Sequence, residues 1–305
     1  MKRDFYIISI RLFTEQYGFT IYLMSFLYRK LYNLYFCLFY LWFMIYFIIS
    51  WLIILFICTT FGNILIDIYD KVCDNKAYYN ILDKLILGIG FIFIPLSVIS
   101  FWFPLNHYVL SVFLLICVLY NVICKNKFKE TYIGIFRNLR LLDIKQIITL
   151  GLSILTILIV IVWPSFQYDS IYYHWQQIMW NETYPVIPGL ANLEDRFGFN
   201  SNYLLISSVF SLRFLTGNGV YALRSLMFLL MILWVLNNVF RSRYSVLSIL
   251  CLLGLLFMFI LCANELNDTS TDIIPNLCIF YIFIKTVLQK GWYKKANTAK
   301  HLFYP

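Results

Sequence analysis

The chain has 305 residues, of which 62% are hydrophobic and 13% are charged, and its formal net charge is +9. The hydrophobic residues form blocks long enough to cross a bilayer, which takes about 20 residues per helix. These blocks lack the alternation over roughly ten-residue segments that is typical of a membrane β-barrel. The composition therefore excludes a barrel and predicts an all-α, polytopic helical membrane protein whose first partner is the lipid bilayer.

The apolar blocks predict seven membrane-spanning helices. In chain order they lie at residues 36–60, 85–103, 107–124, 146–164, 221–240, 244–262 and 273–289. A further apolar block, 203–216, contains Arg213 and is shorter than a crossing requires. We expect it to form an interfacial helix at the membrane surface.

The basic residues lie beside the predicted spans, chiefly in segments 125–140, 241–243 and 285–300. An excess of positive charge marks the cytoplasmic side of a membrane protein, so this placement indicates topology and not a nucleic-acid partner. With the basic segments inside, the loops 165–220 and 263–272 both face outward. The same count places the N-terminus outside, although the N-terminal segment is itself basic.

Composition and span positions divide the chain into four regions. They are a basic N-terminal segment (1–34), the N-terminal helices with a cytoplasmic basic loop (35–145), a module of helices with two outer loops (146–290), and a basic C-terminal tail (291–305).

The eight cysteines include no CxxC pair, and most lie inside apolar blocks, where a thiol packs as a small hydrophobic group. Neither a zinc site nor a disulfide framework is predicted, and no residue is assigned as a metal ligand. A divalent cation stays open as a cofactor, because the carboxylates are not at a diagnostic ligand spacing.

The outer loop 165–220 is the longest polar stretch between spans. Loops of this length usually have a function beyond connection. From Ser170 to Glu182 the residue spacing predicts an amphipathic helix lying on the membrane surface. Its apolar face comprises Ile171, Trp175, Ile178 and Met179, and its polar face comprises His174, Gln177 and Asn181.

Asp169 stands at the start of this helix and has two interpretations. As an N-cap it would accept a backbone N–H and need no function. As a carboxylate at the mouth of a helix bundle it could act as a general base or hold a cation. His174 is a candidate proton shuttle or phosphate contact, or a packing residue among aromatic neighbours.

Three further polar residues leave alternatives open. Arg196 either clamps a phosphate through two parallel hydrogen bonds or pairs with its acidic neighbours in the sequence. Asn200 is a candidate cap for the helix that follows. Asp272, in the second outer loop, is either a helix cap or part of an acidic junction that faces a charged substrate.

Two motifs in the first outer loop indicate a family. Residues 168–180 read Tyr-Asp-Ser-x-x-Tyr-His-x-Gln-x-x-x-Trp, and residues 188–201 read Pro-Gly-Leu-Ala-Asn-Leu-x-x-Arg-Phe-Gly-Phe-Asn-Ser. Together with Ser-Thr-Asp-Ile-Ile-Pro at 270–275, they resemble a family of uncharacterised bacterial multispan membrane proteins related to the GT-C glycosyltransferases. The resemblance covers residues 45–290 and is most specific in the first outer loop.

The resemblance implies a GT-C-like bundle whose large outer loop carries a catalytic acid and interfacial helices. The donor would be a sugar on a polyprenyl phosphate, and the acceptor a polysaccharide or a lipid. Asp169 would deprotonate the acceptor hydroxyl, and His174 or Arg196 would bind the departing lipid phosphate. Asn192, Asn200 and Asp272 would contact substrate. The location implied is the bacterial inner membrane, with the active loops facing outward.

The sequence departs from this family in two ways. Relatives usually carry an acidic pair near the first loop, whereas here Ser170 follows Asp169. They also continue with more spans, which implies a truncated or split copy.

The leading hypothesis is a membrane glycosyltransferase acting in cell-surface polysaccharide or glycolipid assembly. The alternatives are a transport or assembly component, such as a translocator or polymerase partner, and an inactive truncated copy.

Overall fold

The computed structural model describes residues 40–73, 79–134, 140, 142–162, 167–198, 201–242 and 244–288. The chain divides into two units, residues 1–46 and 47–305. Of the first unit, residues 40–46 are described, and they are helical. The predicted basic segments 1–34 and 291–305 lie outside the described residues.

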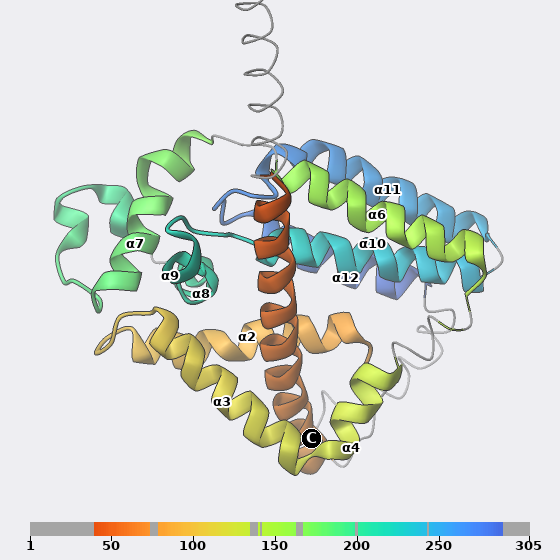
Figure 1. Ribbon diagram of the computed structural model, residues 1–305, viewed down its shortest axis with the longest axis horizontal. Coiled ribbons are helices and arrows are strands. Elements are labelled where there is room, and N and C mark those ends of the chain that lie inside the picture. Colours follow the sequence, from red (N-terminus) through yellow and green to blue (C-terminus); the bar gives the residue numbers. More distant parts are fainter. Residues whose placement is uncertain are drawn as a thin grey trace, which may run out of the picture. The chain divides into compact units, whose positions relative to one another are not determined.

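Helices build the described fold, and no strand occurs in it (Figure 1). Every predicted apolar block forms a helix. These helices are Tyr40–Cys73, α2 (Ile81–Ile99), α3 (His107–Ile123), α6 (Ile144–Val162), α10 (Leu223–Arg241), α11 (Val246–Cys262) and α12 (Ile273–Leu288). The prediction of an all-α, polytopic helical membrane protein is confirmed.

Within the described residues, five helices are long and apolar enough to cross a membrane. They are Tyr40–Cys73, α2, α6, α10 and the stretch Val246–Glu265 that includes α11. The count rises to six if α3 and the helical stretch Lys125–Ile133, which meet at a bend of 101°, form one broken span. The seventh apolar helix, α12, has only 16 residues.

α2 begins at Ile81, earlier than predicted, because Asn80 caps it. The Asn80 side chain accepts a hydrogen bond from the Asp83 backbone N–H at 2.9 Å, and the Asp83 carboxylate accepts one from the Asn80 N–H at 2.9 Å. Such a capping box satisfies two otherwise unpaired backbone donors. The Tyr281 hydroxyl and the Lys285 ammonium of α12 also donate to Asp83. The start of α2 is thereby tied to the later half of α12.

The predicted basic loop after α3 is partly helical. It forms α4 (Lys125–Phe128) and a π-helix (Lys129–Ile133). Lys127 forms an ion pair with Asp67 on the first helix. The Lys84 ammonium of α2 donates to the Thr131 hydroxyl at 2.7 Å. These contacts hold the basic segment against the ends of two helices.

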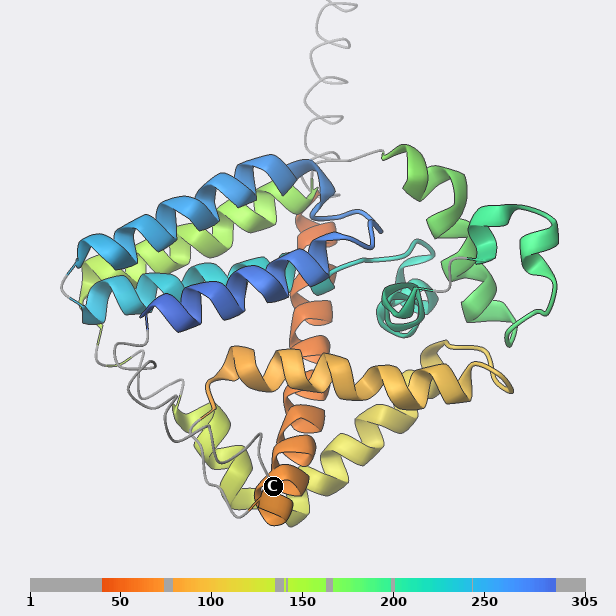
Figure 2. The ribbon, with the colours of Figure 1, turned by 180° about the vertical axis from the view of Figure 1, so that it is seen from behind.

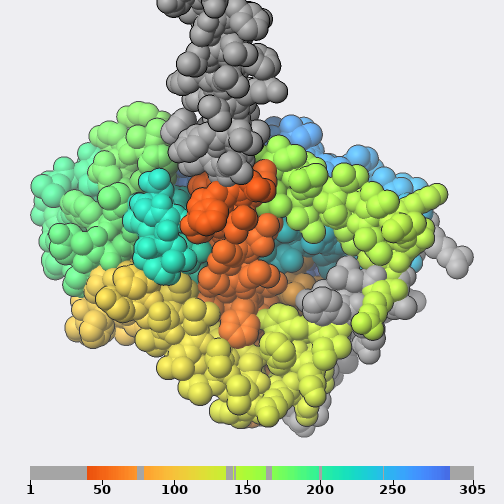
Figure 3. All heavy atoms as spheres, in the orientation of Figure 1, coloured from red at the N-terminus to blue at the C-terminus, as the bar shows by residue number. Residues whose placement is uncertain are grey.

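α10 is the most enclosed of the long helices. It packs against α6, α11 and α12, and the four helices lie side by side in both ribbon views (Figure 1; Figure 2). Near its start, Ser225 accepts a buried hydrogen bond from the Trp51 indole N–H at 3.0 Å. α6 instead lies at the surface of the molecule (Figure 3). Apolar side chains such as Ile148 and Leu152 are exposed on it, as on a lipid-facing helix.

The block 203–216 forms two short helices, α8 (Asn202–Phe210) and α9 (Arg213–Thr216). The chain breaks between them at Leu212, which adopts the left-handed conformation with φ 49°. At about 1.5 Å per residue α8 is too short to cross a bilayer, as predicted. It is not a one-sided surface helix, however, because all its residues from Tyr203 to Phe210 are buried. Contacts with α2, α3 and α7 surround it.

The first helix and α2 approach each other closely through two glycines. A β-carbon at Gly88 would fall against the carbonyl group of Cys58, and one at Gly62 against the carbonyl group of Lys84. Only glycine permits backbones to come this near, as in other membrane helix pairs.

We expect Gly88→Ala to destabilise the protein by about 1–3 kcal/mol, since main-chain atoms of the first helix would have to move. The midpoint of thermal unfolding in detergent measures this. Gly90→Ala is the matched control on the same helix, because a β-carbon there meets nothing within 4 Å. Equal loss of stability in both variants would contradict the proposed backbone contact.

Candidate functional site

The first outer loop begins with a helix whose orientation differs from the prediction. A π-helix, η2 (Ser170–His174), continues into α7 (Trp175–Thr183), so the predicted helix is present. Its polar residues Ser170, His174 and Gln177 are buried, whereas the apolar Ile171 and Met179 are exposed. The predicted polar face is therefore largely buried, and so is Ile178 of the predicted apolar face. π-helical turns are frequent at functional sites.

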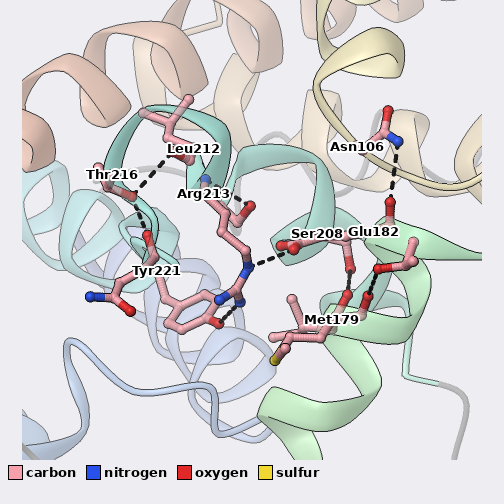
Figure 4. A network of polar contacts seen from close by, with 12 residues as sticks. Asn106, Met179, Glu182, Ser208, Leu212, Arg213, Thr216 and Tyr221 are labelled. Carbon is pink, nitrogen blue, oxygen red and sulfur yellow. Dashed lines mark hydrogen bonds and ion pairs between the residues drawn. The ribbon is translucent and has the colours of Figure 1, made fainter.

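The far end of α7 is anchored by a polar network (Figure 4). The Arg213 guanidinium donates to the Glu182 carboxylate at 2.6 Å and to the Tyr221 hydroxyl at 3.2 Å. The Asn106 side chain donates to the Glu182 backbone carbonyl at 3.1 Å. Burial raises the pKa of Tyr221 to about 12, which keeps it a neutral partner of the arginine. The network joins α7, α9 and the turn between α2 and α3.

Asp169 and Arg196 form an ion pair on the exposed rim of the loop. The Arg196 guanidinium donates to the Asp169 carboxylate at 2.8 Å, and it also lies over the rings of Tyr172 and Tyr173, 5.1 and 5.5 Å from their centroids. Asp169 makes no capping hydrogen bond to the helix. The sequence left open whether Arg196 binds a phosphate or pairs with its acidic neighbours. In the structure it forms an ion pair, but with Asp169 and not with those neighbours.

The two outer loops come together around Tyr173 and His174. Asp272 is exposed at the start of α12, where its carboxylate accepts a hydrogen bond from the Thr271 hydroxyl at 3.1 Å. Burial raises the pKa of Tyr173, and the negative charges of Asp169 and Asp272 act in the same direction. Acidic residues of both loops therefore influence the same side chain, Tyr173.

The two loops and the start of α10 also carry a group of buried polar side chains. Arg224 at the start of α10 and Asp268 in the second outer loop are fully buried, and His174 is 3% exposed. No hydrogen-bond partner is present among the described residues for the three guanidinium nitrogens of Arg224, either ring nitrogen of His174 or the Asp268 Oδ2 atom. The hydroxyls of Ser170 and Thr269 are buried and unpartnered in the same way. We call these five residues the buried polar cluster.

The members of the cluster act on one another electrostatically. Burial is the main cause that lowers the pKa of His174. Arg224 lowers it further, whereas Asp268, Asp169 and Asp272 oppose the change. At neutral pH the imidazole is therefore uncharged, and both a buried cation and carboxylates act on it.

Sequence reasoning missed Arg224 and Asp268. Arg224 lies in the predicted span 221–240, and an ionisable residue within a span is itself a signal for a functional site. Asp268 is one of three acidic residues in the second outer loop, and nothing local in the sequence distinguishes it from Asp272. Burial distinguishes the two, and it depends on tertiary packing.

The remaining candidates do not join the cluster. Asn192 is exposed on the short 3₁₀-helix Leu190–Asn192. Asn200 lies outside the described residues, while Ser201 caps α8 by accepting from the Tyr203 N–H at 3.3 Å. Among the described residues no group of three or more His, Cys, Asp or Glu side chains is placed to hold a metal ion.

Comparison with known families gives one match. Residues 44–304, most of the chain, match the model of a family described as a domain of unknown function, DUF8201. The chain belongs to the DUF8201 family. The DUF8201 match includes both outer loops and the buried polar cluster. Comparison with curated proteins and with solved structures found no match. The relation to GT-C enzymes therefore stays a prediction.

The lowered pKa of His174 predicts a pH-dependent stability. Below the ordinary value of 6.5, the unfolded chain binds a proton that the folded protein does not take up. Proton binding by the unfolded chain lowers the free energy of unfolding. The effect is absent well above pH 6.5 and grows as the pH falls below that value. We expect the thermal unfolding midpoint to decrease between pH 7.5 and pH 5 less steeply in His174→Gln than in the wild type. The difference in the free energy of unfolding is about 1.4 kcal/mol for each unit by which folding lowers the pKa of His174. Parallel pH profiles would contradict a neutral buried imidazole.

Proposed function

We propose that this DUF8201 protein is a membrane glycosyltransferase of the GT-C type. It transfers a sugar from a polyprenyl-phosphate-linked donor to a polysaccharide or lipid acceptor at the outer face of the inner membrane. The observation that carries the proposal is an exposed carboxylate, Asp169, held at 2.8 Å by Arg196 in the same loop whose His174 is acted on by the fully buried Arg224. Such an arrangement offers a base beside a site for negative charge.

Asp169 is accessible to an acceptor. Its side chain is 57% exposed although one carboxylate oxygen is engaged by Arg196. The ion pair fixes the carboxylate while leaving it open to solvent and to an incoming hydroxyl group. In the proposed reaction Asp169 takes the acceptor proton, and the acceptor oxygen displaces the lipid phosphate from the anomeric carbon. A single displacement of this kind inverts the anomeric centre and needs no second nucleophilic carboxylate.

The positive groups stabilise the leaving phosphate. Negative charge develops on the phosphate oxygens as the glycosidic bond breaks, and preorganised donors at that point lower the barrier. Arg196 lies on the rim and Arg224 lies below it, so the lipid phosphate can be bound between the loop and the helix ends. The exposed apolar faces of the spans would accommodate the polyprenyl tail.

One observation favours the alternative of a lipid-linked-sugar translocator. Transporters commonly carry ionisable residues within their spans, and Arg224 is such a residue in the first turn of α10. A translocator moves the donor across the bilayer without changing it, whereas a transferase consumes it. Product analysis therefore distinguishes the two.

We expect Asp169→Asn to reduce sugar transfer by about 10²-fold or more, since general base catalysis contributes typically that much. Transfer is measured with the protein reconstituted in vesicles and a radiolabelled polyprenyl-phosphate sugar. Asp195→Asn is the matched control, because Asp195 is an exposed acid in the same loop. Full transfer by Asp169→Asn would eliminate Asp169 as the base. Transbilayer movement of intact donor without any transfer would favour the translocator.

Orientation is testable by thiol labelling in whole cells. In a background without the native cysteines, Asn192→Cys and Asn267→Cys are expected to react with a membrane-impermeant reagent. Lys145→Cys is the control, because it lies at the opposite end of α6 from the outer loop. It should react only after the membrane is opened. Labelling of Lys145→Cys in intact cells together with protection of Asn192→Cys would invert the proposed topology.

A further inference from the structure

The guanidinium of Arg224 is buried without an acceptor in the part of the protein that the structure describes. Its side chain is 0% exposed, and none of its three nitrogens has a hydrogen-bond partner among the described residues. No carboxylate of the described residues lies within 4.0 Å of it, although Arg213 and Lys285 have such partners. An arginine cannot shed its charge at physiological pH, and burial of an unpaired cation costs several kcal/mol. The unpaired N–H donors of its guanidinium therefore indicate an anionic ligand.

The surroundings of Arg224 add donors suited to a tetrahedral oxyanion. The guanidinium lies over the ring of Tyr203, 5.9 Å from its centroid. The ring therefore covers one face of the guanidinium plane. His174 and Ser170 contribute unpartnered groups from η2, and Thr269 contributes a hydroxyl from the second outer loop. Unpartnered buried polar groups thus come from three chain segments, and the charges of Arg224 and Asp268 both act on His174.

We propose that Arg224, together with His174, Ser170 and Thr269, forms a buried site for the phosphoryl group of a ligand. The planar guanidinium binds two phosphate oxygens side by side. The hydroxyls and the imidazole donate to the remaining oxygens. The site deepens the proposed function, and it rests on that function for the lipid tail of the ligand. Phosphate of a lipid headgroup and free phosphate share this chemistry.

Asp268 makes the charge of the ligand a determinant of affinity. Its fully buried carboxylate accepts the Thr269 backbone N–H at 2.8 Å through one oxygen and leaves the other oxygen unpartnered. A negative charge near the bound phosphoryl group opposes a second negative charge on the ligand. A singly charged phosphodiester, which is the form of a sugar-linked lipid phosphate, is thereby favoured over a doubly charged monoester. In the proposed transfer, Arg224 then holds the donor and Arg196 on the rim stabilises the charge that develops on the leaving phosphate, while Asp268 promotes release of the monoester product.

The test uses the full-length protein in detergent and reads binding, not sugar transfer. The probes are a short prenyl phosphate, a prenyl phosphodiester, the matching prenol and inorganic phosphate. We expect the phosphodiester to raise the thermal unfolding midpoint most and the prenol not to raise it. A response to inorganic phosphate as strong as to the prenyl compounds would identify free phosphate as the source, and a weaker response would identify the lipid headgroup.

Three variants of the site and one control separate the site from general effects. Arg224→Met should weaken phosphoryl binding about tenfold or more, and Arg224→Lys should retain part of it. Asp268→Asn should bind the monoester more tightly than the wild type does, because a repulsive charge is lost. Tyr221→Phe is the control, since its hydroxyl is engaged by Arg213 and should not affect binding.

Wild-type affinity in Arg224→Met would overturn the site. If that variant does not fold, unchanged or weaker monoester binding by Asp268→Asn would overturn it instead. Binding that depends on Arg224 in a protein that transfers no sugar would refute the proposed function and leave the site standing. Sugar transfer by a protein whose phosphoryl binding does not depend on Arg224 would refute the site and leave the proposed function standing.

Discussion

A charged side chain placed among apolar helices needs an opposite charge or a hydrogen-bond partner, because neither lipid nor apolar side chains solvate it. The fold meets this constraint repeatedly. Lys285 reaches Asp83, Lys127 reaches Asp67, and Arg213 reaches Glu182, and each pair joins elements distant in the sequence. Charge pairing thus determines which helix ends lie together, and Arg224 is the fully buried cation for which the described protein supplies no carboxylate.

The same constraint explains the inverted helix of the first outer loop. A helix on a membrane surface would turn its apolar side inward and its polar side to water. η2 and α7 instead bury the polar Ser170, His174 and Gln177 together with the apolar Ile178, in an interior that also contains the buried Arg224 and Asp268. The apolar residues Ile171 and Met179 are left on the outside. A loop that exposes Ile171 and Met179 and buries polar side chains can contact a bilayer while holding a charged group.

The positions of the spans could be predicted from the sequence because a run of apolar residues is a local property. The bounds of α3, α6 and α12 follow directly from such runs. The capping of α2 by Asn80 was also a local feature, yet the apolar run alone placed the helix start too late. By contrast, the Asp169–Arg196 pair joins residues 27 positions apart, and the burial of Asp268 depends on where α10 and η2 pack. Side-chain direction in the site is a tertiary property, so the sequence named Asp169 and His174 but not their buried neighbours.

The complete burial of α8 has a consequence for how the outer loop behaves. A lid that opens for substrate is normally attached at its ends and rests on the surface by a few contacts. Here the middle of the loop passes through the protein and is enclosed by α2, α3 and α7. The loop cannot lift away as a unit without breaking up the packing of the spans. Loop and spans therefore form one cooperative unit, and a lipid-borne substrate would have to enter sideways from the bilayer.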